Sequence, residues 1–398
     1  MDNGLVKTPD METTLLQKYA DKLARAGLTE AGGALFGLRG APTLWSRADA
    51  ACASLETVMA AIDKQAVLFA EPAEPYRTII AYLAETSDGV IAPRDFETRI
   101  FLQDLPVLPD MDPPSVAAVL KRRRSVVIAG RGVITFGRTG PEAAFVLYSS
   151  VCFACFVKFF SDMLDHARRN SMDHRRREVL NAVLERLDAP PVSDGTLMRG
   201  PFREEEQILA AMAEAGRRMV DDRLVDSNFG NISYFADPML YISRKGGALD
   251  ELQGRIVSVS LADSGLPPQT ASTEFPAHRE IVLAAGRRAV LHGHPKFAVI
   301  LSMDCDQDDC EDRNNCHIRC PRPRRIGDIP VVSGEAGGGP FGLCHTVPPA
   351  MRDHRGVIVY GHGLFTTGKD DFNEAYERLS AIENSCRREY FRRIQHFT

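Results

Sequence analysis

The chain has 398 residues, of which 44% are hydrophobic and 25% charged, a balance typical of a folded protein with room for two domains. The formal net charge is -5, so there is no broad basic excess of the kind that nucleic-acid binding requires. We predict no secretory signal at the start and no membrane-spanning run. We therefore expect a cytoplasmic protein, without a membrane partner, whose nine cysteines are mostly reduced.

The first half contains one long apolar stretch, residues 143–160. Ser149, Ser150 and Lys158 interrupt it, and its pattern predicts a buried helix. Proline, glycine, serine and aspartate then cluster at residues 188–201, a composition typical of a linker. We therefore expect two domains, residues 1–190 and 200–398.

Beyond this linker, residues 203–223 carry helix formers and predict a helix that leads into a strand at Asn231. A second apolar run, residues 240–243, predicts a strand that ends in a turn containing Lys245 and Gly246. The lysine could supply a charge for an anion or could be a solvated turn residue, and the sequence leaves both open.

A hydroxyl pair, Ser272 and Thr273, precedes a helical pattern at residues 278–285. Such a pair predicts a helix N-cap that also serves as an anion cradle. Glu274 beside it is a candidate general acid or base. Its alternative role is that of a capping-box carboxylate at the helix start.

Three histidines occupy two apolar runs, residues 289–295 and 356–363, that predict buried strands. His292 and His294 are two residues apart, so on a strand they point the same way. With His362 they could form an open metal site with a position for water or substrate, although a His-x-His pair can also be polar packing. Gly293, Gly361 and Gly363 would allow a ligand or another strand to come close.

Four cysteines lie between the two histidine runs: Cys305, Cys310, Cys316 and Cys320. They could bind a second, structural zinc ion or an iron–sulfur cluster. Their spacing lacks the usual tight pairs, and the alternative is a reduced, exposed loop.

The order of these motifs resembles the class II aldolase/adducin family over roughly residues 205–395. The resemblance implies an α/β fold with two tandem class II aldolase-like α/β/α three-layer domains and mostly antiparallel central sheets. It implies that His292, His294 and His362 hold zinc or another divalent metal and that Glu274 moves a proton. It assigns phosphate binding to a set of five residues: Asn231, Lys245, Gly246, Ser272 and Thr273.

The expected function is that of a metal-dependent lyase, which cleaves a small, phosphorylated or keto-acid-like hydroxy-carbonyl substrate through an enediolate. Retro-aldol cleavage is the first reading, and decarboxylation or dehydration is the alternative. Family aldolases use a tyrosine after the second zinc histidine, and this sequence has no tyrosine between Tyr241 and Tyr360. An interpretation of another class is a non-catalytic, adducin-like scaffold.

The first domain resembles a degenerate copy of the second without metal ligands. Residues 125–132 are similar to 356–363, and Arg131 stands where His362 does. Glu74 matches Glu274 by spacing. Because family members form four-fold rings, the duplication implies a homodimer that acts as a pseudo-tetramer.

Overall fold

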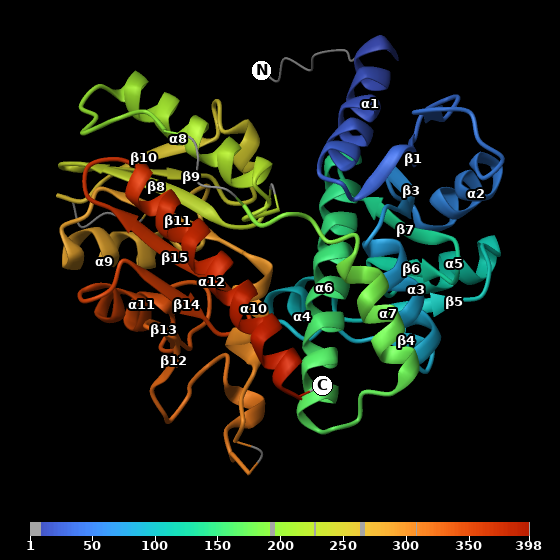
Figure 1. Cartoon of the computed structure of the whole chain (residues 1–398). Helices are drawn as coiled ribbons and strands as arrows, with labels where there is room; N and C mark the ends of the chain where they lie inside the picture. The colour runs from blue at the N-terminus through green and yellow to red at the C-terminus, as the bar shows by residue number, and fades with distance from the viewer. Residues whose placement is uncertain (1–8, 192–195, 227, 263–266, 308, 398) are drawn as a thin grey trace. The chain divides into compact units, whose positions relative to one another are not determined.

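The computed structural model describes residues 9–191, 196–226, 228–262, 267–307 and 309–397. The chain divides into two compact units, coloured mainly blue to green and yellow to red in Figure 1. The first unit contains Met1–Met163 and Ser171–Asp188, and the second contains Leu164–Asn170 and Ala189–Thr398.

In the described part of the first unit, seven strands form a sheet in the order β2-β1-β3-β7-β6-β5-β4. The pair β5–β6 is parallel and the other neighbours are antiparallel. The elements are α1 (Pro9–Arg25), β1 (Thr29–Leu38), β2 (Leu44–Trp45), α2 (Cys52–Ile62), β3 (Ala66–Pro72), α3 (Tyr76–Thr86), β4 (Val90–Ile91), α4 (Phe96–Leu102), β5 (Leu105–Leu108), α5 (Pro113–Leu120), β6 (Ser125–Ile128), β7 (Gly132–Gly137), α6 (Pro141–Arg168) and α7 (His174–Leu184).

The two faces of this first sheet are buried by different helices. Residues of α2 and α5 form one core cluster with Ile134 and Phe136 of β7. Because side chains alternate along a strand, Thr135 points to the opposite face, and its hydroxyl donates to the carbonyl of Ala144 in α6 at 2.9 Å. The sheet therefore lies between two helical layers.

Helix α6 contains the apolar run at residues 143–160, and the expected buried helix is confirmed. Within the described residues it is the helix that is long and apolar enough to cross a membrane, judged by length and composition alone. Most of its apolar stretch is buried inside the structure. A buried core helix passes the same test of length and composition.

The second unit, as far as it is described, has eight strands in the order β10-β9-β8-β11-β15-β14-β13-β12, of which only the pair β13–β14 is parallel. Its elements are α8 (Glu205–Asp221), β8 (Asn231–Ala236), β9 (Met239–Ser243), η1 (Leu249–Glu251), β10 (Ile256–Ser260), α9 (Phe275–Ala285), β11 (Ala289–Gly293), α10 (Lys296–Met303), η2 (Arg313–Asn315), β12 (Arg324–Ile326), β13 (Ile329–Val332), α11 (Leu343–Met351), β14 (Gly356–Val359), β15 (Gly363–Gly368) and α12 (Asn373–Phe397).

Helices also cover both faces of the second sheet. Residues of α9 and α11 share a core cluster with Val290 and Phe365. A side chain at Gly293, which lies on the other face of β11, would approach Met219 of α8 and Leu379 of α12. His292 lies two residues after Val290 on β11, so its side chain points to the same face of the sheet, towards the layer of α9 and α11. Glu274, the N-cap residue of α9, lies in this layer.

Two expectations about local structure need correction. Strand β14 ends at Val359, so His362 lies in the turn between β14 and β15 and not on a strand of residues 356–363. Helix α9 begins at Phe275 with Glu274 at its N-cap position, so Ser272 and Thr273 precede the cap. Pro276 explains the starting point because its ring fixes a helical φ and it has no N–H to satisfy.

Candidate metal centre and active site

The end of strand β11 positions the first two histidines. His292 pairs with Phe365 of β15 and with Asn231 of β8, so its backbone is held on both sides. His294 follows the last strand residue, and its N–H donates to the carbonyl of Leu224 at 3.0 Å. The sheet and the loop after α8 therefore fix both backbones before any ligand is considered.

The turn between β14 and β15 presents His362. Gly361 has a φ of +56°, a left-handed conformation that glycine adopts without strain. Its N–H donates to the hydroxyl of Ser302 in α10 at 2.8 Å. This bond ties the His362 turn to the helix that begins just after His294.

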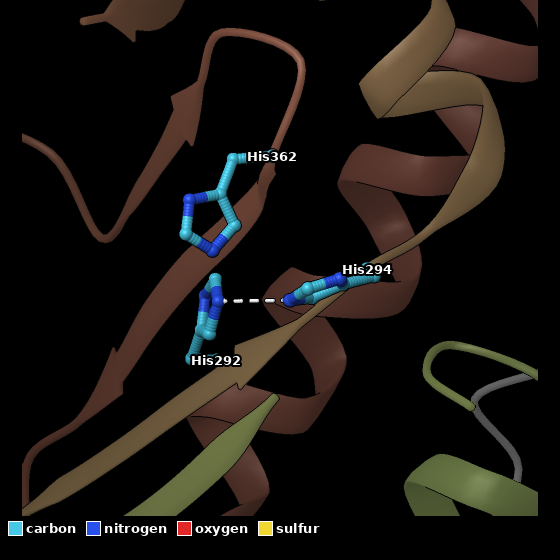
Figure 2. Close-up of side chains that lie close together, drawn as sticks. All are labelled: His292, His294 and His362. Atoms are coloured by element: carbon cyan, nitrogen blue, oxygen red, sulfur yellow. Dashed lines mark hydrogen bonds between the residues drawn. The ribbon is translucent and has the colours of Figure 1, made fainter. Parts of the chain in front are cut away.

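The three imidazoles converge, as Figure 2 shows. Their ring centroids are 4.8 Å apart for His292 and His294, 5.1 Å for His292 and His362, and 5.3 Å for His294 and His362. One candidate ligand atom from each lies within 4.8 Å of the others, and all three residues are buried. The Nε2 atoms of His292 and His294 are only 3.0 Å apart. Three imidazoles that converge in this way fit a divalent cation such as zinc.

The tautomer of His292 supports this fit. Its Nδ1 lies 3.3 Å from the carbonyl oxygen of Leu364, which can only accept a hydrogen bond. With the proton on Nδ1, the lone pair of Nε2 is directed at the cluster. Burial lowers the pKa of His292 well below its ordinary value, and the ring stacks on Phe365 at 4.0 Å. The ring is therefore neutral and held in one orientation.

Glycines give the histidines room. A Cβ on Gly363 would lie 2.5 Å from the carbonyl oxygen of Gly293 and 2.8 Å from Cε1 of His292. A Cβ on Gly293 would lie 2.8 Å from the carbonyl oxygen of Leu224. The expected close approach of another segment is thus confirmed at these two glycines, whereas Gly361 is required by its backbone conformation.

Glu274 lies against the histidines. Its Oε1 is 3.1 Å from Nε2 of His362, and its Oε2 is 3.4 Å from Nε2 of His292. It makes no side-chain capping bond to α9, so the capping-box interpretation is wrong. Burial raises the pKa of this carboxyl, but the hydrogen bonds from His362 and from the amide of Asn231 favour its ionised form, and the pKa lies below its ordinary range. The carboxylate is therefore held in its ionised form beside the histidines.

A buried chain of polar groups continues from Glu274. The amide Nδ2 of Asn231 donates to Oε2 of Glu274 at 2.8 Å. The amide oxygen of Asn231 is hydrogen-bonded to Nε2 of His278, whose Nδ1 lies 2.6 Å from the hydroxyl of Ser233. Sequence reasoning gave His278 no role, although it follows Glu274 by four residues and such pairs share a helix face.

The other predicted phosphate residues lie beside this chain. Arg244 and Ala271 form an isolated β-bridge, and the N–H of Lys245 donates to the carbonyl of Thr270 at 2.9 Å. The turn around Gly246, whose φ is +66°, is exposed, as is Thr273. Ser272 is buried, and its hydroxyl accepts from the N–H of Glu274 at 3.3 Å. The structure therefore brings this loop and turn together next to Glu274, while it directs the Asn231 amide to Glu274 and His278.

The cysteine stretch has a different arrangement. Among the described residues, the three histidines form the group with metal-ligand geometry, and the four cysteines do not form a second one. The thiol of Cys316 contacts the backbone carbonyls of Asp312 and Arg313 at 3.5 and 3.1 Å, and burial raises its pKa. This thiol is accordingly protonated and engaged within its own loop.

Comparison with known proteins gives matches for this half of the chain. Residues 210–390 match the family described as Class II Aldolase and Adducin N-terminal domain. A methylthioribulose-1-phosphate dehydratase from Gluconobacter oxydans (strain 621H) is 29% identical over 193 residues, covering 43% of this chain and 86% of that protein. The family match includes all three histidines, Glu274, Asn231 and His278.

Two solved structures are also similar. L-fuculose-1-phosphate aldolase from Thermus thermophilus is 26% identical, with a TM-score of 0.39, over 48% of this chain and 97% of that one. The putative aldolase/epimerase/decarboxylase YgbL from Klebsiella pneumoniae is 22% identical, with a TM-score of 0.39, over 50% of this chain and all of that one.

Proposed function

We propose that this protein is a metal-dependent lyase that acts on a small phosphorylated hydroxy-carbonyl compound through an enediolate. The observation that carries the proposal is the buried carboxylate of Glu274, whose Oε1 lies 3.1 Å from Nε2 of His362 at a cluster of three imidazoles. An acid–base group and a set of metal ligands at one point are what proton removal next to a carbonyl needs.

In this proposal His292, His294 and His362 hold the cation, for which zinc is the first candidate. A divalent cation at this point would polarise a carbonyl group and stabilise negative charge that develops on its oxygen. Imidazole ligands carry no negative charge, so they would leave the full charge of the cation to act on the substrate. Thiolate ligands would partly cancel that charge.

Glu274 serves as the base through a defined oxygen. Its Oε2 already accepts a hydrogen bond from Asn231, whereas its Oε1 faces His362. We assign the proton removed from substrate carbon to Oε1, from which it can be returned to the product. The exposed turn of Lys245 and Gly246, with Ser272, would bind the phosphate through backbone N–H groups, a hydroxyl and the lysine charge.

Loss of water is the first reaction to test, with retro-aldol cleavage as the alternative. In dehydration, Glu274 would remove the proton next to the carbonyl, and the enediolate would expel the β-hydroxyl, which leaves as water after taking up that proton. In retro-aldol cleavage, the β-hydroxyl would lose its proton, the carbon–carbon bond would break to give an aldehyde and an enediolate, and Glu274 would deliver the proton to the enediolate carbon. The similarity to a dehydratase, which extends over 86% of that protein, favours dehydration. So does the absence of a tyrosine between Tyr241 and Tyr360, because the family aldolases use that residue as their second proton donor.

The test uses the full chain loaded with zinc, cobalt or manganese. Methylthioribulose 1-phosphate and fuculose 1-phosphate are the substrates, and loss of water is distinguished from carbon–carbon cleavage by product analysis. We expect turnover in the parent, a loss of roughly 10²–10⁴-fold in Glu274→Gln with its metal retained, and a loss of both metal and turnover in His362→Ala. A parent that binds no metal and converts neither substrate would contradict the proposal and favour a non-catalytic scaffold.

The metal count also tests the cysteine stretch, for which a second metal site remains a proposal. Its support is the occurrence of four cysteines within residues 305–320. Replacing all four cysteines by serine should lower the zinc content from two ions per chain to one. A parent with a single zinc that His362→Ala removes would rule out this second site.

We also propose that the first unit is a degenerate copy of the second. The strand order β2-β1-β3-β7-β6-β5-β4 matches β9-β8-β11-β15-β14-β13-β12, with the parallel pair at the same place. Thr135 donates to Ala144, and Thr366 makes the same bond to Ala375 at 2.8 Å.

Equivalent positions then follow from the strand register. Phe69 pairs with Ile134 as His292 pairs with Phe365, so Phe69 replaces the first metal ligand, and Arg131 replaces His362. Glu74 follows β3, whereas Glu274 precedes the helix before β11, so the match of these two glutamates by spacing is wrong.

A further inference from the structure

The most informative feature beyond the metal cluster is the direction of the buried polar chain behind Glu274. The amide NH₂ of Asn231 faces Oε2 of Glu274 at 2.8 Å and donates a hydrogen bond to it. The amide oxygen of Asn231 then faces Nε2 of His278. Since that oxygen only accepts, Nε2 has to carry the proton.

The same logic fixes the far end of the chain. With its proton on Nε2, a neutral His278 has a bare Nδ1, and that atom lies 2.6 Å from the hydroxyl of Ser233. The hydroxyl therefore donates to Nδ1. Burial lowers the pKa of His278 to about 4, which keeps the ring neutral near pH 7, and the ring is fully inaccessible.

We propose that His278 is a positioning residue that sets the amide orientation of Asn231 and, through it, the direction of the Glu274 carboxylate. Every donor in the chain points from Ser233 towards Glu274. If His278 carried its proton on Nδ1, two lone pairs would face each other at Asn231 unless the amide turned over. A turned amide would present its oxygen to the Glu274 carboxylate, which repels it.

The consequence is a division of labour between the two carboxylate oxygens. Asn231 holds Oε2, and Oε1, which lies 3.1 Å from Nε2 of His362, is the oxygen to which we assign the proton that substrate gives up. Without the His278 donor, the Asn231 amide can rotate, and the carboxylate loses the bond that holds it. This inference deepens the proposed function and rests on it for the consequences on turnover, but the hydrogen-bond directions can be measured without any substrate.

Two variants with matched volumes separate the donor from the space it fills. His278→Gln keeps an N–H donor at about the position of Nε2, and His278→Leu fills the cavity without a donor. Zinc content and thermal unfolding midpoint establish that each variant is folded and loaded. Full-length zinc-loaded protein, labelled with ¹⁵N in histidine and asparagine, provides the readout that does not depend on activity.

We expect the His278 ring nitrogens of the parent to show the neutral Nε2–H tautomer. We expect slow exchange of the Asn231 NH₂ protons in the parent and in His278→Gln, and fast exchange in His278→Leu. In turnover of the phosphosugar, His278→Leu should lower kcat by roughly 10–100-fold and change KM by less than about threefold. His278→Gln should stay within about threefold of the parent in both constants.

An Nδ1–H tautomer in the parent overturns the inference, as does unchanged Asn231 exchange or unchanged kcat in a folded, zinc-loaded His278→Leu. A parent that turns over no phosphosugar contradicts the proposed function instead. In that case the tautomer and the Asn231 exchange still decide whether His278 orients the chain.

Discussion

At the scale of single residues, the candidate site depends on glycines as much as on histidines. His292 is held between the carbonyl of Leu364 and the ring of Phe365, and Gly363 lies directly beside it. No side chain fits at Gly363 because the carbonyl oxygen of Gly293 would be 2.5 Å from its Cβ. The position of the His292 ring thus requires a neighbouring residue without a side chain.

Gly363→Ala should therefore displace β15 or the His292 ring. We expect a loss of about 1–3 kcal/mol in the free energy of unfolding and a roughly 10–100-fold weaker affinity for zinc. Gly339→Ala is the control, since nothing lies within 4 Å of a Cβ at that position. Denaturant unfolding and zinc titration measure both quantities, and a Gly363→Ala protein that behaves like the control would contradict the steric argument.

At the scale of elements, helix α10 connects the two histidine-bearing segments. Its first N–H groups, those of Phe297 and Ala298, each donate to the carboxylate of Glu383 in α12 at 2.9 Å. Pro295 at the N-cap position makes no side-chain capping bond. The carboxylate of Glu383 in α12 therefore caps the N-terminus of α10 instead. Further along α10, Ser302 binds the turn of His362.

Glu383→Gln should weaken the start of α10, because an amide NH₂ would then face a backbone N–H. We expect a loss of about 1–3 kcal/mol in the free energy of unfolding. Glu377→Gln on the exposed side of the same helix should change it by less than about 0.5 kcal/mol. If denaturant unfolding gives the same stability for both variants, Glu383 does not cap α10.

Helix α4 of the first unit offers a test by pH. Its N-cap, Asp95, accepts from the N–H of Thr98 at 2.8 Å and is almost fully buried, and burial raises its pKa to about 6. A raised pKa means that the folded state prefers the protonated carboxyl. Its contribution to stability is therefore complete below the ordinary value of 3.8 and is lost as the pH rises through about 6.

Asp95→Asn keeps an acceptor for Thr98 and removes the ionisation. Between pH 4 and pH 7 we expect the parent to lose on the order of 3 kcal/mol relative to the variant, at about 1.36 kcal/mol per pKa unit. The measurement is the free energy of unfolding of both proteins across this range. Parallel curves would show that Asp95 titrates normally.

At the scale of the whole molecule, the two sheets share a strand order while only the second carries the histidine cluster, as far as the described residues show. The second unit is longer than the first mainly between β9 and α9. This segment contains β10, a strand without a counterpart in the first sheet. If the first unit is a copy of the second, as we propose, it has kept the strand order without the metal ligands.

If that retained copy replaces the neighbouring subunit of a ring, the protein should be a dimer. We expect light scattering to give the mass of two chains over a wide concentration range. A stable monomer with full turnover would contradict the pseudo-tetramer. The measurement does not depend on which phosphosugar is the substrate.

The sequence by itself determined the identity of the chemical groups. His292, His294 and His362 could be selected because strand parity and small neighbours are local properties. The helix at residues 143–160 could be predicted for the same reason, since its apolar length is written in the sequence. The directions of the hydrogen bonds could not, because they depend on which groups meet after folding.

Only the tertiary structure turned Asn231 towards Glu274, placed His278 behind it, and separated Glu74 from Glu274. Sequence spacing cannot show these relations, since Asn231 and His278 lie on different elements and meet through the pairing of β8 with β11 and the packing of α9. A buried donor must find an acceptor wherever the fold supplies one. Local pattern therefore determines which residues can react, and long-range packing determines which of their atoms are free to do so.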